Sequence, residues 1–290
     1  GKAGAEFGLS PTAATQRIQL LEHTVGAQLL HRTTRAVSLS SDGEVFLGHA
    51  QRIMADVENA LSDVQSGPQS VRGELRVAGS AAFGRRFIAP FMAEFLEMYP
   101  NVTCQLHLSD AVFDIVDNGY DMAIRLGSLP PSTLKARKLA YSHRVLVAAP
   151  SYLQKRGIPT TIEELKTHEC LIRSNMRSWT LQTPDGEAKE FKIPGRFSTN
   201  LAEAVSEAAL SGLGIARKCH WEVAEHIASG ELVTVMDDHV NLPEWEVFAI
   251  RPPSRMQPAK VRAFTAFIEE KYHSIASLAP RERLLQSIRH

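Results

Sequence analysis

LSPTAATQRIQLLEHTVGAQLLHRTTRAVSLSSDG, from Leu9 to Gly43, is the segment around which the rest of the chain can be interpreted. Ser10 is a favourable N-cap residue, and Pro11 suits the first turn of a helix, where its missing N–H costs nothing. A helix is therefore predicted to begin here. Its apolar residues recur at helical spacing, which places them on one buried face: Ala14, Ile18 and Leu21.

The opposite face of this helix carries short polar side chains, namely Thr12, Thr15, Gln16 and Gln19. Hydroxyl and amide groups hydrogen-bond to base edges, and short side chains let the helix backbone approach them in a major groove about 12 Å wide. This face is therefore predicted to lie against double-stranded DNA.

A short hairpin is predicted directly after the helix. Gly26 allows a turn, and apolar residues then return to a core and alternate with polar ones as in a strand. The tip of the hairpin, residues 32–35, reads Arg-Thr-Thr-Arg. Because Arg32 and Arg35 can meet a phosphate or a narrow minor groove, the hairpin is predicted to act as a wing.

Spaced positions of this segment resemble the winged helix-turn-helix of LysR-type transcriptional regulators. They are L-S-x-x-A-x-S/T-x-x-I-x-x-L-E at 9–22, G-x-x-L-L/F-x-R-x-x-R at 26–35 and L-S/T-x-x-G at 39–43. Several positions match in one register, which is more specific than any single motif. The resemblance implies DNA contacts through the following residues: Ser10, Pro11, Thr12, Thr15, Gln16, Arg17, Arg32 and Arg35.

Two features depart from the pattern of that family. LysR-type regulators usually have a helix before this segment, whereas this sequence opens at Gly1, so we expect the first helix to be missing from the chain. The family commonly has Ser-Arg where this chain has Thr15-Gln16. The second departure affects the base contacts more than the fold.

The composition places few restrictions on function. With 290 residues, the chain can form two or three domains, and its 44% hydrophobic and 22% charged residues are typical of a soluble globular protein. Lys plus Arg and Asp plus Glu both number 32, so any basic surface that binds DNA must be local. The three cysteines form no C-x-x-C pair, which argues against a disulfide framework and a zinc site.

The same sequence argues against export. The first residues lack the charged and apolar regions of a signal peptide, and no run of about 18 apolar residues occurs. An odd number of cysteines also fits a reducing compartment. We therefore expect a cytoplasmic protein with no membrane partner.

A long helix is predicted from Glu44 to about Ser66, before Gly67-Pro68. Its apolar residues alternate in steps of three and four, which is the seam of a two-stranded coiled coil. A single amphipathic helix packed on its own domain would show the same stripe. Because a helix-turn-helix module usually reads two half-sites, we favour the coiled coil and a homodimer. The stripe consists of Leu47, Ala50, Met54, Val57, Leu61 and Val64.

Beyond residue 73, predicted strands and helices alternate, which favours a mostly parallel sheet with helices on both faces. Strands are expected at 75–78, 102–108, 122–126, 144–149, 170–173, 179–182, 189–193, 232–236 and 245–250, and helices at 87–98, 111–118, 161–167, 201–210 and 261–272. A break near Pro150 divides the region into two lobes joined by two crossing strands. Lobe I covers about 73–144 and 250–275, and lobe II about 145–249.

Four further motifs resemble the effector domain of the LysR-type regulators. They are G-E-L-R-V-A at 73–78, F-L-x-x-Y-P at 95–100, D-M-A-I-R-L-G at 121–127 and G-L-G-I-A at 212–216. The resemblance implies an α/β effector-binding domain of two Rossmann-like lobes, similar to type 2 periplasmic binding proteins. The expected organisation is a winged helix-turn-helix domain at 1–43, a coiled-coil linker helix at 44–67 and an effector-binding domain at 68–290.

A ligand of such a domain lies beyond the carboxyl ends of the strands, between the lobes. The resemblance places an effector-contacting loop at Ser80, Ala81, Ala82 and Phe83. Polar residues at or just past strand ends, and one after the Gly-Leu-Gly turn, complete the candidate set: Arg125, Ser128, Arg173, Asn175, Thr199, Asn200 and Arg217. An arginine matches a carboxylate, so an acidic effector is expected. Any one arginine is as often a surface ion-pair partner, and Asn200 also suits the N-cap of the following helix.

No motif predicts catalysis, a metal or a cofactor. Residues 79–84 have the glycine spacing of a P-loop, but Arg85-Arg86 stands where Lys-Ser/Thr is needed. Gly212-Leu213-Gly214 lacks the third glycine of a dinucleotide-binding turn and follows a helix. The chain contains no G-x-S-x-G, H-E-x-x-H or S-x-x-K set with partners.

The sequence therefore predicts a LysR-type transcriptional regulator that binds promoter DNA as a homodimer or homotetramer. A small organic acid, aromatic or hydroxylated, is expected to bind between the lobes and to change their closure. A solute-binding protein of the same two-lobed fold is the first alternative, and an enzyme built on that fold is the second.

Overall fold

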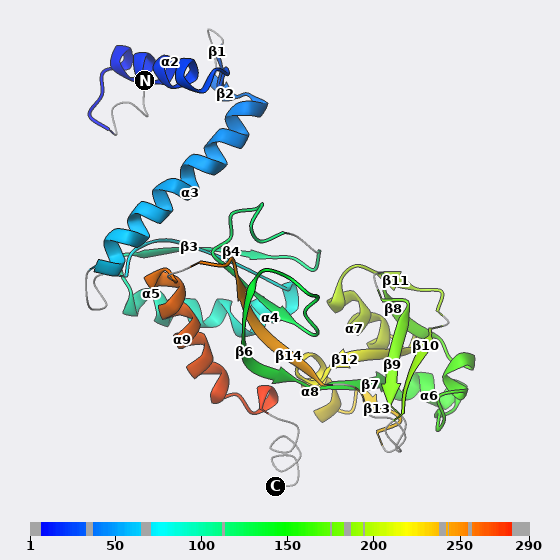
Figure 1. The fold of residues 1–290 in the computed structure, drawn as a ribbon. Coiled ribbons are helices and arrows are strands. Elements are labelled where there is room, and N and C mark those ends of the chain that lie inside the picture. Colours follow the sequence, from blue (N-terminus) through cyan, green and yellow to red (C-terminus); the bar gives the residue numbers. More distant parts are fainter. Residues whose placement is uncertain are drawn as a thin grey trace. The chain divides into compact units, whose positions relative to one another are not determined.

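The computed structural model in Figure 1 describes residues 7–32, 37–64, 71–111, 114–174, 176–182, 187–193, 195–237, 242, 244–254 and 257–279. The chain divides into two compact units, Gly1–Leu61 and Ser62–His290. The first contains the predicted DNA-binding segment and most of the long helix, and the second contains both lobes. Among the described residues, no helix is long and apolar enough to cross a membrane.

The helix α2 (Pro11–Val25) has the ends that the sequence predicts. The Ser10 hydroxyl accepts a hydrogen bond from Ala13 N at 3.2 Å, and Pro11 lies in the first turn. Gly26 ends the helix in the left-handed region, with φ of 74°. The predicted inner face, Ala14, Ile18 and Leu21, is half-buried rather than buried, because little of the described first unit is available to cover it.

The predicted hairpin consists of β1 (Leu30–Arg32) and β2 (Val37–Leu39), which pair antiparallel. Its position is fixed by α2, because the Glu22 carboxylate accepts hydrogen bonds from Leu29 N at 2.8 Å and Leu30 N at 3.0 Å. The strands and the helix therefore form one small unit.

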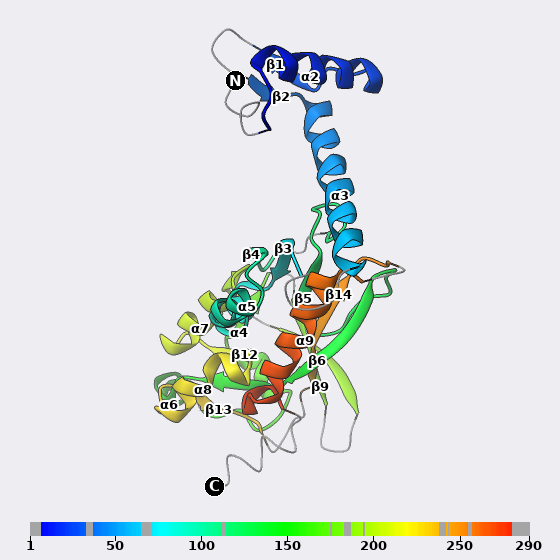
Figure 2. The same ribbon diagram turned by 90° about the vertical axis from the view of Figure 1, so that its left-hand side faces the viewer.

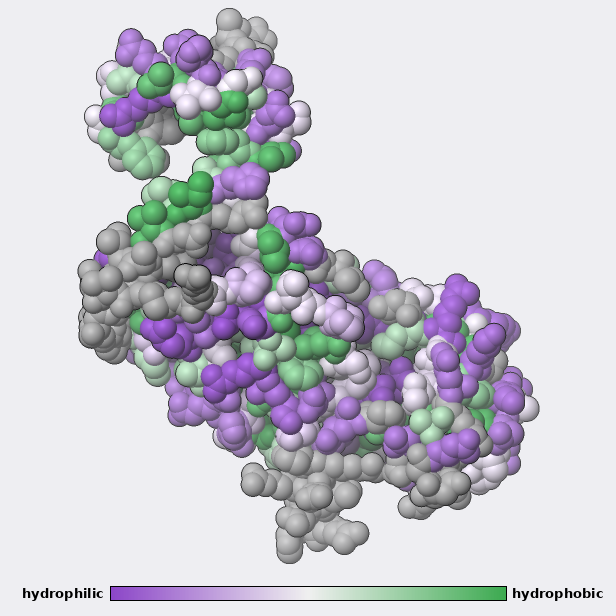
Figure 3. Space-filling view, viewed as in Figure 1, coloured by the Kyte–Doolittle hydropathy of each residue, from purple (hydrophilic) through white to green (hydrophobic). Residues whose placement is uncertain are grey.

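The long helix α3 (Ser41–Val64) begins slightly before its predicted start at Glu44. The Ser40 hydroxyl accepts a hydrogen bond from Gly43 N at 2.9 Å, and a Cβ atom at Gly43 would lie 2.0 Å from the Leu29 carbonyl oxygen. Glycine is therefore required there. Several apolar side chains of α3 are exposed, namely Val45, Leu47, Ile53, Met54 and Val57. Figure 3 shows hydrophobic surface along this helix.

Lobe I is built on a five-stranded sheet with the order β4-β3-β5-β14-β6. The central strand β3 pairs parallel with β4 and β5, whereas β14 pairs antiparallel with β5 and β6. The bounds are β3 (Gly73–Gly79), β4 (Val102–Leu108), β5 (Met122–Leu126), β6 (Lys135–Ser142) and β14 (Trp245–Arg251).

The helices of lobe I pack on one face of this sheet. Leu75 and Val77 of β3 share a core with Phe83, Phe95 and Phe264 from three helices. Figure 2 shows α9 lying across the strands. On the opposite face, a smaller core that includes Ile115 covers β3, β5 and β14. The helical segments are α4 (Ala81–Phe87), η2 (Ala89–Phe91), α5 (Met92–Met98), α9 (Ala259–His273) and η4 (Ala276–Leu278).

Lobe II contains a second five-stranded sheet with the order β11-β8-β12-β7-β13, together with a hairpin of β9 and β10. β8 pairs parallel with β11 and β12, and β7 pairs antiparallel with β12 and β13. The bounds are β7 (Arg144–Ala148), β8 (Cys170–Arg173), β9 (Ser178–Gln182), β10 (Ala188–Lys192), β11 (Ser198–Thr199), β12 (Ile215–Cys219) and β13 (Val233–Thr234).

Helices cover both faces of the lobe II sheet. α6 (Pro150–Arg156), η3 (Glu164–Thr167) and the hairpin share one core, which includes Trp179. α7 (Ala202–Leu210) and α8 (His220–Ala228) share the other, which includes Val205 and Val223.

The lobes are joined covalently and by an aromatic cluster. Only His143 separates β6 from β7, and a second connection runs from β13 back to β14. Trp221 of α8 packs against Phe83 and Phe87 of α4, with ring centroids 5.4 and 5.3 Å apart, and its Nε1–H donates to Ser142 Oγ at 3.0 Å. A helix of lobe II is therefore anchored in the core of lobe I.

Four expectations about this region are wrong. Both sheets are mixed rather than mostly parallel, because β14 and β7 run antiparallel to their neighbours. The whole of β14 belongs to the lobe I sheet, so lobe II does not extend to residue 249. No described helix lies on the second face of lobe I. Instead of a helix at 111–118, its described part forms turns, in which Asp114 Oδ1 accepts hydrogen bonds from Val116 N and Asp117 N.

Candidate DNA-binding and effector-binding sites

The first half of α2 presents the polar surface that the sequence predicts. The side chains expected to meet DNA are exposed at five positions, and Thr15 is half-buried. Ser10 caps the first turn of α2 and leaves its side chains accessible. The five exposed residues are Ser10, Pro11, Thr12, Gln16 and Arg17.

The wing is described only in part. Arg32 ends β1 and pairs with Val37 of β2. Its side chain, and the whole of Arg35, lie outside the described residues. The described strands of the hairpin pair from Leu30 with Leu39 to Arg32 with Val37.

A pocket of about 50 Å³ lies where the carboxyl ends of β8 and β12 meet the two connections between the lobes. Its aromatic walls are Trp179 and Trp245. Its charged lining residues are Arg144, Arg173, Arg217, Lys218 and Glu222. Two of the predicted residues, Arg173 and Arg217, therefore come together in one pocket.

The cations of this pocket differ in their partners. Lys218 Nζ lies 2.7 Å from Glu222 Oε1 and donates to the Ala202 carbonyl at 2.7 Å, so its charge is paired. Arg217 has no carboxylate partner among the described residues. Its Nη2 contacts Met176 Sδ at 3.4 Å, and its guanidinium lies 5.6 Å from the centre of the Trp179 ring.

Burial lowers the pKa of two of these arginines. The pKa of Arg217 falls to about 9, mainly because of desolvation and also because of the charge of Arg144. Desolvation lowers the pKa of Arg144 to about 10, and its guanidinium lies 4.7 Å from the centre of the Trp245 ring. Both arginines remain protonated at pH 7, so the pocket holds two positive charges that repel each other.

Arg173 faces a carboxylate from lobe I. Its Nη2 lies 3.8 Å from Asp110 Oδ2 and donates to the Asp110 carbonyl oxygen at 3.3 Å. The two Asp110 oxygens also accept hydrogen bonds from Ala81 N and Ala202 N, each at 3.1 Å. Asp110, only 4% exposed, thus connects the start of α4 with the start of α7.

The predicted loop 80–83 contributes less than expected. Ala81 uses its backbone N–H, and the half-buried Ser80 lies next to it. Phe83 is fully buried in the lobe I core, and Ala82 is buried as well. Their side chains therefore pack in that core.

The other predicted residues do not line this pocket. Arg125 is half-buried with a pKa lowered by desolvation, and Ser128 and Asn200 are exposed. Asn175 lies outside the described residues. Asn200 is not the N-cap of α7 either. Leu201 holds that position, and its N–H donates to Thr199 Oγ1 at 3.2 Å.

Several residues of the site were not predicted, among them Asp110, Arg144, Lys218 and Trp245. Asp110 lies just past the end of β4, a position equivalent to those of the residues that were predicted. Arg144 and Trp245 lie at the start of their strands, and they reach the pocket because those strands lead out of a connection between the lobes. Of these residues, only Asp110 could have been predicted from its position just past the end of a strand.

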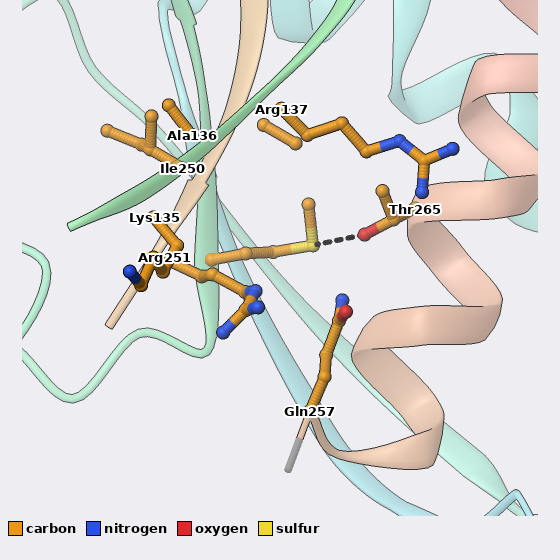
Figure 4. A pocket seen from close by; sticks show the side chains of 9 residues that line it. Lys135, Ala136, Arg137, Ile250, Arg251, Gln257 and Thr265 are labelled. Atoms are coloured by element: carbon orange, nitrogen blue, oxygen red, sulfur yellow. Dashed lines mark hydrogen bonds between the residues drawn. The ribbon is translucent and has the colours of Figure 1, made fainter. Parts of the chain in front are cut away.

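A second cavity, of about 90 Å³, lies inside lobe I between the sheet and α9 (Figure 4). Met122 and Thr265 line it, with Thr265 Oγ1 at 3.9 Å from Met122 Sδ, and Lys135, Arg137 and Arg251 surround it. Lys135 and Arg137 are exposed, and Arg137 is paired with Glu269 at 2.5 Å. Water screens these charges, so they favour an anion less than the half-buried Arg217 does.

Neither cavity has the ligands of a metal site. Among the described residues, no group of three His, Cys, Asp or Glu side chains is placed to hold a metal ion. The glycines of residues 79–84 serve packing: a Cβ atom at Gly84 would lie 2.1 Å from Leu108 Cδ2.

Both units of the chain match models of known protein families. Residues 1–44 match the model described as "Bacterial regulatory helix-turn-helix protein, lysR family", and residues 68–272 match the "LysR substrate binding domain". The chain belongs to the LysR family of transcriptional regulators. The predicted family and fold class, a winged helix-turn-helix followed by an effector-binding domain, are confirmed.

Curated relatives of this LysR-type regulator agree. The HTH-type transcriptional regulator DmlR of Escherichia coli (strain K12) is 34% identical over 272 residues, which cover 92% of this chain and 87% of DmlR. The HTH-type transcriptional activator TtdR of the same strain is 34% identical over 250 residues, 85% of this chain and 81% of TtdR. These relatives are transcriptional regulators, so the enzyme alternative is excluded.

Solved LysR-type structures have the same fold. CrgA from Neisseria meningitidis is 28% identical, with a TM-score of 0.63, and the match covers 93% of this chain and 92% of CrgA. The full-length Vibrio cholerae virulence activator AphB is 28% identical, with a TM-score of 0.62 and 89% of each chain covered. LysR-type regulators bind promoter DNA and small-molecule effectors and form oligomers.

Proposed function

We propose that this LysR-type regulator responds to a small organic acid, whose carboxylate binds Arg217 in the pocket between the lobes. The observation that carries this proposal is the half-buried guanidinium of Arg217, which has no carboxylate partner among the described residues and whose pKa is lowered by desolvation. The carboxylate of the effector would form an ion pair with this guanidinium.

The physical argument concerns the cost of burial. A charge held away from water without a counter-ion destabilises a protein, and a bidentate carboxylate offsets that cost with two strong hydrogen bonds. Arg144 adds a second positive charge to the same pocket. A neutral or cationic ligand would leave the repulsion between the two arginines in place.

The aromatic walls narrow the class of acid. Trp179 and Trp245 each already face a guanidinium, so a planar group inserted next to them keeps favourable contacts with both ring and cation. This favours a small aromatic acid. A hydroxy acid is the second candidate, because the polar groups of the pocket can bind a hydroxyl.

A thermal-shift screen of the full chain tests the effector class. Small aromatic, hydroxy and keto carboxylates are compared with the matching amides and amines. We expect at least one acid to raise the melting temperature and its amide to have no effect. Arg217→Gln should abolish the shift, whereas Arg156→Gln, which removes an exposed arginine of the same lobe, should retain it. A response to neutral or cationic compounds alone would contradict the proposal.

For DNA, we propose that the exposed face of α2 enters the major groove, with Thr12, Thr15 and Gln16 at base edges and Arg32 and Arg35 at the backbone or minor groove. Two copies would pair through α3 and read a partly palindromic site, and two dimers would form a homotetramer. The exposed apolar side chains of α3 support this pairing. A gel shift with promoter DNA also separates this function from the solute-binding alternative, which predicts no complex.

A further inference from the structure

The starts of α4 and α7 are capped in an unusual way. The N-cap residues, Ser80 and Leu201, provide no side-chain hydrogen bond to their helices. The first N–H group of each helix donates instead to the same residue, Asp110, at 3.1 Å in both cases. The carboxylate of Asp110 therefore caps the N-termini of both helices.

This carboxylate also crosses from one lobe to the other. Asp110 and α4 belong to lobe I, whereas α7 belongs to lobe II. The side chain of Asp110 is only 4% exposed, so water competes weakly for its hydrogen bonds. Two exposed ion pairs also join the lobes at the surface, where solvent weakens them: Arg85 of α4 with Glu203 of α7, and Arg86 of α4 with Glu225 of α8.

Arg173 connects this contact to the proposed effector pocket. It lies on β8, next to Asp110 on one side, and it lines the pocket of Arg217 on the other. Its Nε atom is buried and has no hydrogen-bond partner among the described residues. Arg173 thus lines the pocket and keeps one donor without a partner in the described part of the chain.

We propose that Asp110 is a built-in carboxylate latch that holds the two lobes together without an effector, and that an acidic effector weakens the latch by competing for Arg173. The second half rests on the proposed function, and the first does not. Ligand binding would then alter lobe closure through its unequal affinity for the latched and released arrangements.

The test of the latch needs no effector. In the full chain, Asp110→Asn keeps the size of the side chain but removes its charge and one of its two acceptor oxygens. Asp117→Asn, an exposed aspartate of the same loop, is the matched control. Hydrogen exchange of peptides that contain Ala81 and Ala202 should accelerate, by about tenfold for the N–H group that faces the amide nitrogen of Asp110→Asn and by less for the one that still donates to its uncharged oxygen. Asp117→Asn should exchange like the original chain.

A distance measurement separates a latch between lobes from a local cap. Spin labels at Glu97→Cys on α5 and Lys155→Cys on α6, both exposed positions, report the separation of the lobes. Chains that carry both labels are diluted with unlabelled chain, so distances within one chain dominate. The native thiols react slowly, because burial raises the pKa of Cys170 and Cys219 to about 12 and that of Cys104 to about 11.

We expect Asp110→Asn to broaden this distance distribution or shift it to longer values, and Asp117→Asn to leave it unchanged. Identical distributions for Asp110→Asn and the original chain would overturn the latch. If the latch opposes binding, an acid found in the thermal-shift screen should bind Asp110→Asn about tenfold more tightly. Equal affinity would overturn the release step. If no acid binds either form, the proposed effector class and the release step both fail, while the distances still decide the latch.

Discussion

Removal of the Arg217 guanidinium is expected to affect binding and stability in opposite directions. Arg217→Gln should lose the acid response and yet keep the free energy of unfolding or raise it by up to about 1 kcal/mol, because it removes a half-buried charge without a carboxylate partner among the described residues. Arg173→Gln is the matched contrast. It should lower the free energy of unfolding by about 2 kcal/mol, because Asp110 would remain buried and lose its cation. Urea unfolding without ligand measures both, and equal destabilisation by the two changes would refute the unpaired state of Arg217.

Two glycines of α3 provide a second contrast between single residues. Gly43→Ala would place a Cβ atom 2.0 Å from the Leu29 carbonyl oxygen, so the backbone must shift, at a cost of about 2–4 kcal/mol. At Gly48 a Cβ atom meets nothing within 4 Å, so Gly48→Ala should stabilise the helix by up to about 1 kcal/mol. Hydrogen exchange of α2 and the hairpin reports both changes. Equal protection in the two variants would show that the Gly43 contact is not restrictive.

His168 predicts a pH dependence for lobe II. Its pKa lies below the ordinary 6.5, chiefly because of burial, with a smaller effect of the charge of Arg156. Its Nδ1 lies 3.1 Å from the Tyr152 hydroxyl, which accepts from Glu169 N and so has its proton free for the neutral ring. The unfolded chain therefore takes up a proton first on acidification. Stability contributed by the neutral ring is full above pH 6.5 and is lost as pH falls through 6.5 toward the lowered pKa.

His168→Gln should flatten this decline, because glutamine retains an acceptor for Tyr152 but does not titrate. The free energy of unfolding, measured by urea at about pH 7.5 and pH 5.5, gives the slope. His23→Gln, at an exposed position of α2, is the control. A decline that is equally steep in His168→Gln would assign the acid sensitivity to other groups.

At the scale of elements, α3 should be stable as a long helix only when its apolar stripe is covered. Met54 is 60% exposed in one chain. Met54→Glu places a charge on the proposed seam and should weaken the dimer at least about tenfold. Asn59→Glu, at a position of α3 opposite the stripe, should have little effect. Analytical ultracentrifugation of the full chain measures the dissociation constant. An unchanged dissociation constant in Met54→Glu would exclude pairing of two chains through this stripe.

Helices and strands were predicted correctly where residues with a clear local preference mark their ends. α2 was predicted correctly because Ser10, Pro11 and Gly26 mark both of its ends. β6 was not predicted, because its first half, Lys-Ala-Arg-Lys, is exposed and polar on a strand at the edge of the sheet. α8 begins directly after β12 and carries no proline or glycine between them, so no local signal separated the two.

The site shows a similar division. Arg173 was predicted from its position at a strand end and Arg217 from its position after the Gly-Leu-Gly turn, and both line the pocket. Arg144 and Trp245 join them only through the crossing of the chain between lobes, which no local pattern reveals. The direction of β14, antiparallel to β5, is likewise a tertiary property, and it decided the boundary between the lobes.

At the scale of the whole molecule, the chain binds DNA with no excess of positive charge, since Lys plus Arg and Asp plus Glu both number 32. Its affinity should therefore depend on a few local cations. Arg35→Ala is expected to weaken binding to all sequences alike and to reduce the salt slope by about 1, whereas Gln16→Ala should mainly relax sequence selectivity. Gel shifts at several salt concentrations measure both. An unchanged slope in Arg35→Ala would exclude the wing from phosphate contact.

The connection between β6 and β7 consists of one residue, His143. Arg144, which lines the pocket, is the first residue of β7 and follows His143 directly. Under the proposed function, an acid that binds this arginine acts one residue from a covalent connection between the lobes, so a small displacement there would turn one lobe relative to the other.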